Sequence, residues 1–161
     1  MSELIGRTAS DFGFQKLDGS EARFAEHGGK PLLLIVFHSG CPWCRIELPK
    51  LSEMFARHAE VGVQLLGIAV GQDTPESAAA FAQELELSFP VGVDTRGEMR
   101  QAYPLGRVPT VLVIDRAGVI LRAYEGWAEQ LPGIVEQALL SVARGDELPD
   151  YALVGNGCAV G

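Results

Sequence analysis

Residues 32–48 have the sequence LLLIVFHSGCPWCRIEL, and this stretch decides the fold. Its first six residues, Leu32–Phe37, are continuously apolar, which is typical of a strand buried on both faces, as in a parallel sheet. Apolar side chains then recur with helical spacing from Pro42 to His58, and Pro42 suits a first helical turn because its missing N–H has no partner there. Pro49 is expected to kink or break this helix. The stretch therefore predicts a buried strand leading directly into a helix, with two cysteines at the junction.

The rest of the chain continues the alternation of strands and helices. Asp18-Gly19 predicts the tight turn of an N-terminal β-hairpin at about residues 12–24. Further strands are expected at 63–70, 90–93, 110–115 and 119–124, and further helices at 75–85, 97–103 and 130–144. This order predicts an α/β fold in which a mixed central β-sheet has helices on both faces. We expect one domain over residues 1–144 and a C-terminal tail over 145–161.

The composition excludes several classes of protein. The 161 residues are 47% hydrophobic and 21% charged, which suits a globular protein and argues against disorder. A net charge of −8 lacks the basic surface that nucleic-acid binding uses. The longest apolar run, Pro31–Phe37, is too short to span a membrane. The first residues lack the pattern of a signal peptide, so the sequence as written predicts a cytoplasmic protein; a periplasmic or extracytoplasmic location is the alternative if an export segment was removed.

Cys41-Pro42-Trp43-Cys44 is the sharpest chemical feature. Two cysteines three residues apart on a first helical turn bring their sulfurs close enough to bond, so the sequence predicts a redox-active Cys41–Cys44 disulfide. The positive end of the helix favours thiolate over thiol at the first cysteine. Because the thiolate is the attacking species in disulfide exchange, we expect Cys41 to be the more exposed nucleophile and Cys44 the resolving thiol.

A metal site is the alternative for the same cysteines. Structural zinc takes four ligands, and the further candidates are Cys158 and three histidines, of which His38 lies three residues before Cys41. No second closely spaced ligand pair supports such a site. The expected chemistry is redox exchange with no cofactor and no bound metal.

Val108-Pro109-Thr110 is the second feature, directly before the strand expected at 110–115. Proline at the first residue of a strand costs no ladder hydrogen bond. A cis Val108–Pro109 bond would mark a tight turn whose backbone is open to an incoming extended chain, and an ordinary trans proline is the alternative.

Together these motifs resemble the thioredoxin-like thiol–disulfide oxidoreductases of the TlpA/ResA/DsbE type, within the AhpC/TSA-like superfamily. The pattern C-x-x-C-[RK]-x-E-x-P starts at Cys41, Val108-Pro109-Thr110 is similar to the family's cis-proline loop, and Gly6–Gly19 is similar to its N-terminal hairpin. The resemblance covers roughly residues 4–144.

The resemblance implies a thioredoxin-like fold and a set of roles. Cys41 would attack a substrate disulfide and Cys44 would resolve it, while a cis Pro109, with Val108, would align the substrate sulfur. Glu47 lies one turn after Cys44, and burial raises a carboxyl pKa, so this side chain is a candidate to carry the Cys44 proton; a solvated surface charge is the alternative.

Three further residues are left with open roles. Trp43 is expected at the exposed rim of the site, either as a platform that contacts protein substrates or as a shield over the disulfide. His38 is either an accessory group near Cys41 or a filler at the strand end. Cys158, in a glycine-rich segment, is either an inert surface thiol or a thiol that exchanges with the Cys41–Cys44 pair.

The predicted function is thiol–disulfide exchange with protein substrates. An upstream thiol reductant or oxidant is the expected second partner, which would return the cysteine pair to its starting redox state. A thiol-dependent peroxidase is one alternative, although His38 stands where typical peroxiredoxins have Thr or Ser. A copper- or zinc-binding chaperone is the other.

Overall fold

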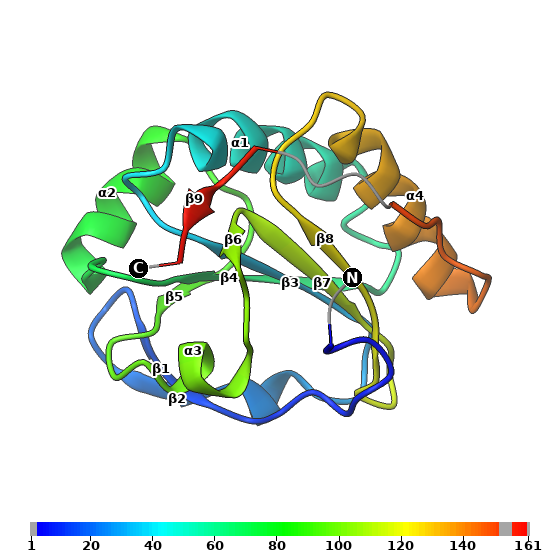
Figure 1. The fold of residues 1–161 in the computed structure, drawn as a ribbon, viewed down its shortest axis with the longest axis horizontal. Coiled ribbons are helices and arrows are strands. Elements are labelled where there is room, and N and C mark those ends of the chain that lie inside the picture. Colours follow the sequence, from blue (N-terminus) through cyan, green and yellow to red (C-terminus); the bar gives the residue numbers. More distant parts are fainter. Residues whose placement is uncertain (1–2, 152–155, 161) are drawn as a thin grey trace.

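The computed structural model describes residues 3–151 and 156–160, and a seven-stranded mixed sheet forms its centre (Figure 1). The strand order is β2-β1-β5-β4-β3-β7-β8. The strands are β1 (Gly13–Lys16), β2 (Glu21–Arg23), β3 (Leu32–Phe37), β4 (Gln64–Ala69), β5 (Val91–Val93), β7 (Thr110–Ile114) and β8 (Ile120–Glu125). β3, β4 and β5 are parallel, whereas β1, β2, β7 and β8 pair antiparallel with their neighbours. This is the expected thioredoxin-like fold with its N-terminal hairpin β1–β2.

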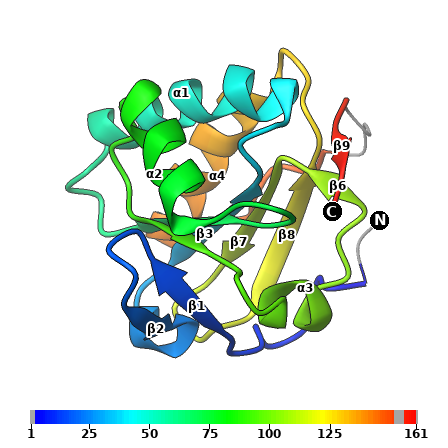
Figure 2. The same cartoon turned by 90° about the vertical axis from the view of Figure 1, so that its left-hand side faces the viewer.

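Helices cover both faces of the sheet. They are α1 (Pro42–Arg57), α2 (Pro75–Glu84), α3 (Glu98–Ala102) and α4 (Leu131–Arg144), with a short 3₁₀ helix η1 (Phe24–His27) after the hairpin. Figure 2 shows α1, α2 and α4 above one face and α3 at the opposite face. β3 is buried along its whole length, as its uninterrupted apolar sequence predicts.

The helix α1 continues through Pro49 and ends only at Arg57. Of the two effects expected of Pro49, a kink or a break, the break is therefore wrong. Residues on both sides of Pro49, including Leu48 and Leu51, are fully buried against the core. This packing holds the helix together despite the hydrogen bond that proline cannot make. Consequently α1 carries its N-terminal cysteines on a long, fixed element.

The C-terminal segment turns back across the molecule after α4. Leu148 is buried, and the Arg122 and Tyr124 side chains donate hydrogen bonds to the carbonyl oxygens of Leu148 and Pro149. Further on, β9 (Cys158–Ala159) pairs antiparallel with β6 (Arg107–Val108). Figure 1 shows this pair, in red and yellow-green, beside the N-terminal end of α1. Residues 152–155 and 161 of the expected tail, and residues 1–2 of the expected domain, lie outside the described residues.

In the described part of the chain, none of the helices has the length and apolar character that crossing a membrane requires.

Candidate active site

The site lies where β3 ends and α1 begins. Cys41 is the N-cap of α1, and the Cys44 and Arg45 backbone N–H groups both donate to the Cys41 carbonyl oxygen in the first turn. β3 is central in the sheet, between β4 and β7, so its carboxyl end carries Cys41 to one end of the sheet. The sequence of a buried strand followed by a proline-started helix thus fixes where the first sulfur lies.

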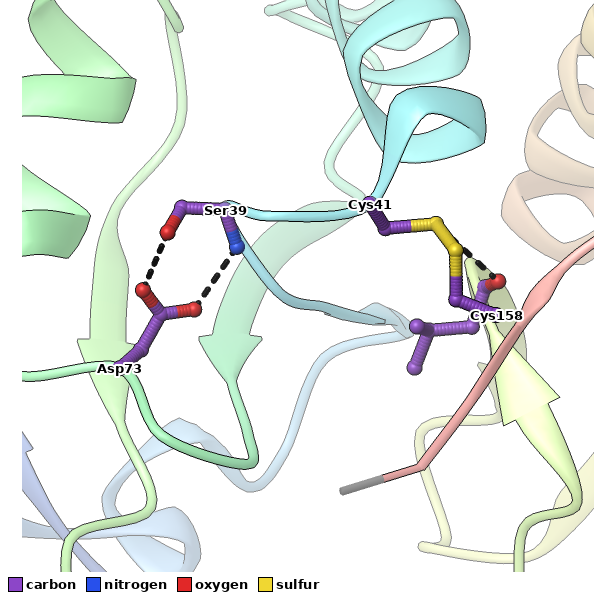
Figure 3. Close-up of a disulfide and its surroundings, with 5 residues drawn as sticks. Ser39, Cys41, Asp73 and Cys158 are labelled. Atoms are coloured by element: carbon purple, nitrogen blue, oxygen red, sulfur yellow. Dashed lines mark hydrogen bonds between the residues drawn. A yellow bond between two sulfur atoms is a disulfide. The ribbon is translucent and has the colours of Figure 1, made fainter.

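Asp73, in the loop before α2, holds the segment that precedes Cys41. Its carboxylate accepts a 2.8 Å hydrogen bond from the Ser39 backbone N–H and a 2.5 Å bond from the Ser39 hydroxyl (Figure 3). The Ser77 hydroxyl donates to the same carboxylate at 2.7 Å. The sequence pattern does not predict this contact, because it joins the loop after β3 to the loop after β4, which are far apart in the sequence. Asp73 therefore positions the loop of residues 38–40 from outside the cysteine motif.

Cys41 forms a disulfide with Cys158 in this structure (Figure 3). The two Cα atoms are 6.0 Å apart across a sequence separation of 117 residues. The structure therefore does not contain the Cys41–Cys44 disulfide expected from sequence, and Cys44 is a free, buried thiol. The interpretation of Cys158 as an inert surface thiol is wrong.

The expectation that Cys41 would be the more exposed cysteine is also wrong. Cys41 and Cys44 are both 0% exposed, whereas Cys158 is half-buried. The cause is the pairing of β9 with β6, which brings Cys158 directly onto the Cys41 sulfur. The C-terminal strand thus covers the Cys41 sulfur.

Val108 and Pro109 lie on the other side of Cys41. The Val108–Pro109 peptide bond is cis, and both residues are buried. The Cys41 Sγ atom is 3.8 Å from the Val108 carbonyl oxygen. The structure therefore brings Cys41, Val108 and the proline loop together at one point, as the sequence motifs predicted.

Cys44 and Glu47 occupy the inner face of α1. Burial raises the pKa of the Cys44 thiol to about 12, and the nearby Glu47 charge contributes in the same direction. Glu47 is itself 0% exposed, and burial raises the pKa of its carboxyl well above the ordinary value of 4.5. Neither Glu47 oxygen has a hydrogen-bond partner among the described residues. The interpretation of Glu47 as a solvated surface charge is therefore wrong.

Two accessory candidates lie at the rim. Trp43 is half-buried against the core rather than fully exposed. His38 is half-buried, and one ring nitrogen together with the Cys41 and Cys158 sulfurs forms a group of atoms within 4.8 Å of one another. With both cysteines reduced, such a group offers nitrogen and sulfur ligands of the kind that zinc and copper take.

The fold and site together define a class: a thioredoxin-like sheet on which a C-x-x-C motif at a helix N-terminus faces a cis-proline loop. Comparison with known proteins agrees. The AhpC/TSA family model matches residues 5–123, and the chain belongs to this family, alongside the ResA/DsbE-type thiol–disulfide oxidoreductases.

The similar proteins are distant in sequence. The thiol-disulfide oxidoreductase ResA of Geobacillus thermodenitrificans is 30% identical over 122 residues, which cover 76% of this chain and 70% of that protein. A putative thiol:disulfide interchange protein DsbE from Chlorobium tepidum has a TM-score of 0.78 at 25% identity, over 86% of this chain and 97% of that one. A hypothetical protein from Sinorhizobium meliloti has the same fold, with a TM-score of 0.87 at 18% identity, over 99% of this chain and 95% of the other.

Proposed function

We propose that this protein exchanges disulfides with protein substrates, with Cys41 as the attacking sulfur and Cys44 as the resolving thiol. The observation that carries the proposal is the position of Cys41 at the N-terminus of α1, in a disulfide with a cysteine that lies on an extended strand. The helix end favours the thiolate that attack requires, and the β6 backbone beside Cys41 accepts an extended partner.

Resolution requires the Cys44 proton to leave a buried environment. With its pKa raised to about 12, Cys44 is a thiol at neutral pH and a poor nucleophile. Glu47, three residues further along α1, is the buried carboxyl group whose charge acts on this thiol. In its ionised form Glu47 takes the Cys44 proton, and the resulting Cys44 thiolate attacks the Cys41 sulfur of the mixed disulfide and releases the reduced substrate.

The test is reduction of insulin disulfides with a small dithiol as the electron donor, followed by trapping with a substrate peptide. Cys44→Ser is expected to accumulate a mixed disulfide between Cys41 and the peptide, because the resolving thiol is gone. Absence of that species would count against the proposal. Peroxide consumption by Cys44→Ser with an external thiol would favour the peroxidase alternative instead.

A metal site is the second candidate, and the clustering of His38, Cys41 and Cys158 is the observation in its favour. Structural zinc takes four ligands, and the cluster supplies three. Zinc or copper added to the fully reduced protein and retained through gel filtration, but lost in Cys41→Ser, would support this candidate.

A further inference from the structure

The C-terminal strand β9 lies where an external cysteine-bearing segment would have to lie. It pairs antiparallel with β6, with Cys158 opposite Val108 and Ala159 opposite Arg107. An extended segment that adds to the same edge with a cysteine opposite Val108 would bring its sulfur to the same place beside Cys41. The chain's own tail and an external segment therefore exclude one another at this edge.

The tail is held by hydrogen bonds before residue 152 and again after residue 155. Before them, Pro149 accepts a 2.7 Å hydrogen bond from the Tyr124 hydroxyl. After them, Asn156 and Trp127 exchange two backbone hydrogen bonds in an antiparallel bridge. The position of Cys158 is thus set by backbone pairing as well as by the disulfide.

Gly157 makes this close approach possible. A Cβ atom built at this residue would lie 2.8 Å from the Val108 carbonyl oxygen, too close for any other residue without a shift of the backbone. A glycine directly before the tail cysteine therefore fits the strand to β6 sterically.

Cys44 completes the arrangement as a second possible partner for the same sulfur. It lies one helical turn after Cys41, is unbonded, and is buried on the side of Cys41 that faces the core. Its attack on Cys41 would break the Cys41–Cys158 bond and form a Cys41–Cys44 bond. The proton lost by Cys44 ends on the Cys158 sulfur, so the step moves no net electrons and needs no further reactant.

We propose that Cys158 is a third exchange cysteine: the Cys41–Cys158 and Cys41–Cys44 disulfides interconvert within one chain, and strand β9 competes with external substrate for the β6 edge. The inference rests on the proposed exchange function of Cys41. The oxidised chain arises when a substrate disulfide takes up the two electrons of two of these thiols and leaves as a dithiol.

The tether gives the tail an advantage over a substrate in solution. A thiol joined to its target by a short stretch of the same chain acts at an effective concentration of about 1 mM. A substrate peptide at about 0.1 mM is then outcompeted about tenfold for Cys41. Release of the tail by Cys44, and its return, consequently set how much of the oxidised protein is open to substrate.

The bonded partner can be identified by non-reducing tryptic mapping of the oxidised full-length protein after the free thiols are alkylated. Cys41 and Cys44 share a fragment that ends at Arg45, and Cys158 is in the fragment 145–161. We expect the two fragments of monomeric wild type to be linked, with Cys44 alkylated, and Cys44→Ser to give only the linked form. A wild-type monomer whose fragments are never linked, or linkage found only between two chains, would overturn the proposal.

Single-turnover oxidation of a peptide with two cysteines by the oxidised protein tests the competition, because the two peptide thiols become one disulfide as the protein disulfide becomes a dithiol. At about 0.1 mM peptide we expect Cys158→Ser to react about tenfold faster than wild type. Gly157→Val keeps all three thiols but displaces β9, so its linked fraction should fall and its rate should approach that of Cys158→Ser. Gly133→Val is the matched control, because nothing lies within 4 Å of a Cβ added at Gly133 and its rate should equal that of wild type.

The outcomes separate this inference from the proposed function. Equal rates for wild type and Cys158→Ser, with only the Cys41–Cys44 disulfide present, would remove the role of Cys158 and leave the exchange function intact. Linked fragments that shift on displacement of β9, in a protein that oxidises no peptide in any variant, would keep the internal exchange and remove the proposed function.

Discussion

Cys158 and Cys44 flank the same sulfur in two contrasting environments. Cys158 is half-buried on a two-residue strand, and Cys41 is bonded to it. Cys44 is fully buried on a 16-residue helix, and burial raises its pKa to about 12. Attack needs a thiolate, so the partner in the more open environment is the easier to activate, whereas the partner in the core depends on a neighbouring base. The comparison teaches that reaction of Cys41 with Cys44 depends on removal of the Cys44 proton, whereas reaction with Cys158 depends on the pairing of β9 with β6.

Loss of Cys41 removes the sulfur with which both Cys44 and Cys158 react, and it should have the largest effect on activity. We expect Cys41→Ala to abolish the reduction of insulin disulfides, because Cys41 is the N-cap of α1 and the remaining helical cysteine, Cys44, is a buried thiol with a raised pKa. Cys158→Ser is the control and should retain turnover, since it leaves Cys41 and Cys44 in place. Turnover by Cys41→Ala at the wild-type rate would mean that another group carries the exchange.

Glu47→Gln tests whether Glu47 removes the proton from Cys44. A general base contributes about 10²-fold or more to a proton transfer, so in a chain that keeps Cys44 we expect resolution of the mixed disulfide with the peptide to slow by about that factor and to lose the pH dependence that Glu47 ionisation gives it. Stopped-flow release of the peptide measured across pH would show both effects. The opposite result is equally definite: the Glu47 charge raises the Cys44 pKa, so if Glu47 acts only as a charge, its removal should speed resolution.

The same substitution has an effect on stability whose sign follows from the raised pKa of Glu47. Below pH about 4.5 the carboxyl is protonated in the folded and the unfolded chain, and ionisation imposes no penalty. As the pH rises, the unfolded chain ionises first. The unfolding free energy then falls by about 1.4 kcal/mol per pH unit until the folded-state pKa is reached. Urea unfolding at several pH values should therefore show Glu47→Gln gaining stability relative to wild type as pH rises; a constant difference would contradict the burial of an ionisable group.

The fold was predictable from sequence because its central elements have strong local patterns. The bounds of β3, Leu32–Phe37, match the apolar run, and α1 starts at the expected Pro42. α2 starts at the expected residue 75, where the Thr74 side chain caps the helix by accepting a hydrogen bond from the Ser77 backbone N–H. Each of these signals lies within a few residues of the element it defines.

The site was only partly predictable, for the corresponding reason. Cys41, Cys44 and Glu47 share one helix, so their spacing indicates their proximity. β6 and β9 have two residues each, too few for any periodicity, and were not predicted. The pairing of Cys41 with Cys158 spans 117 residues and depends on where the chain after α4 is held. Patterns of a few neighbouring residues do not predict that path.

Two buried tyrosines offer a final test, with a smaller expected effect, of whether the path of the C-terminal segment determines the pairing of Cys41 with Cys158. The Tyr124 hydroxyl donates to the Pro149 carbonyl oxygen at 2.7 Å, and the Tyr103 hydroxyl donates to the Ser10 carbonyl oxygen at 2.6 Å. Both side chains are 1% exposed. Tyr124→Phe and Tyr103→Phe should each lower the unfolding free energy by about 1 kcal/mol, the usual net worth of a buried hydrogen bond.

The two variants should differ in the disulfide. Tyr124→Phe loosens the segment that leads to Cys158, so the Cys41–Cys158 fraction in the tryptic map should fall and the Cys41–Cys44 fraction should rise. Tyr103→Phe loosens a segment near the N-terminus and should leave both fractions as they are in wild type, although the chain is equally destabilised. If the two variants change the fractions alike, general stability rather than the path of the tail governs which cysteine Cys41 selects.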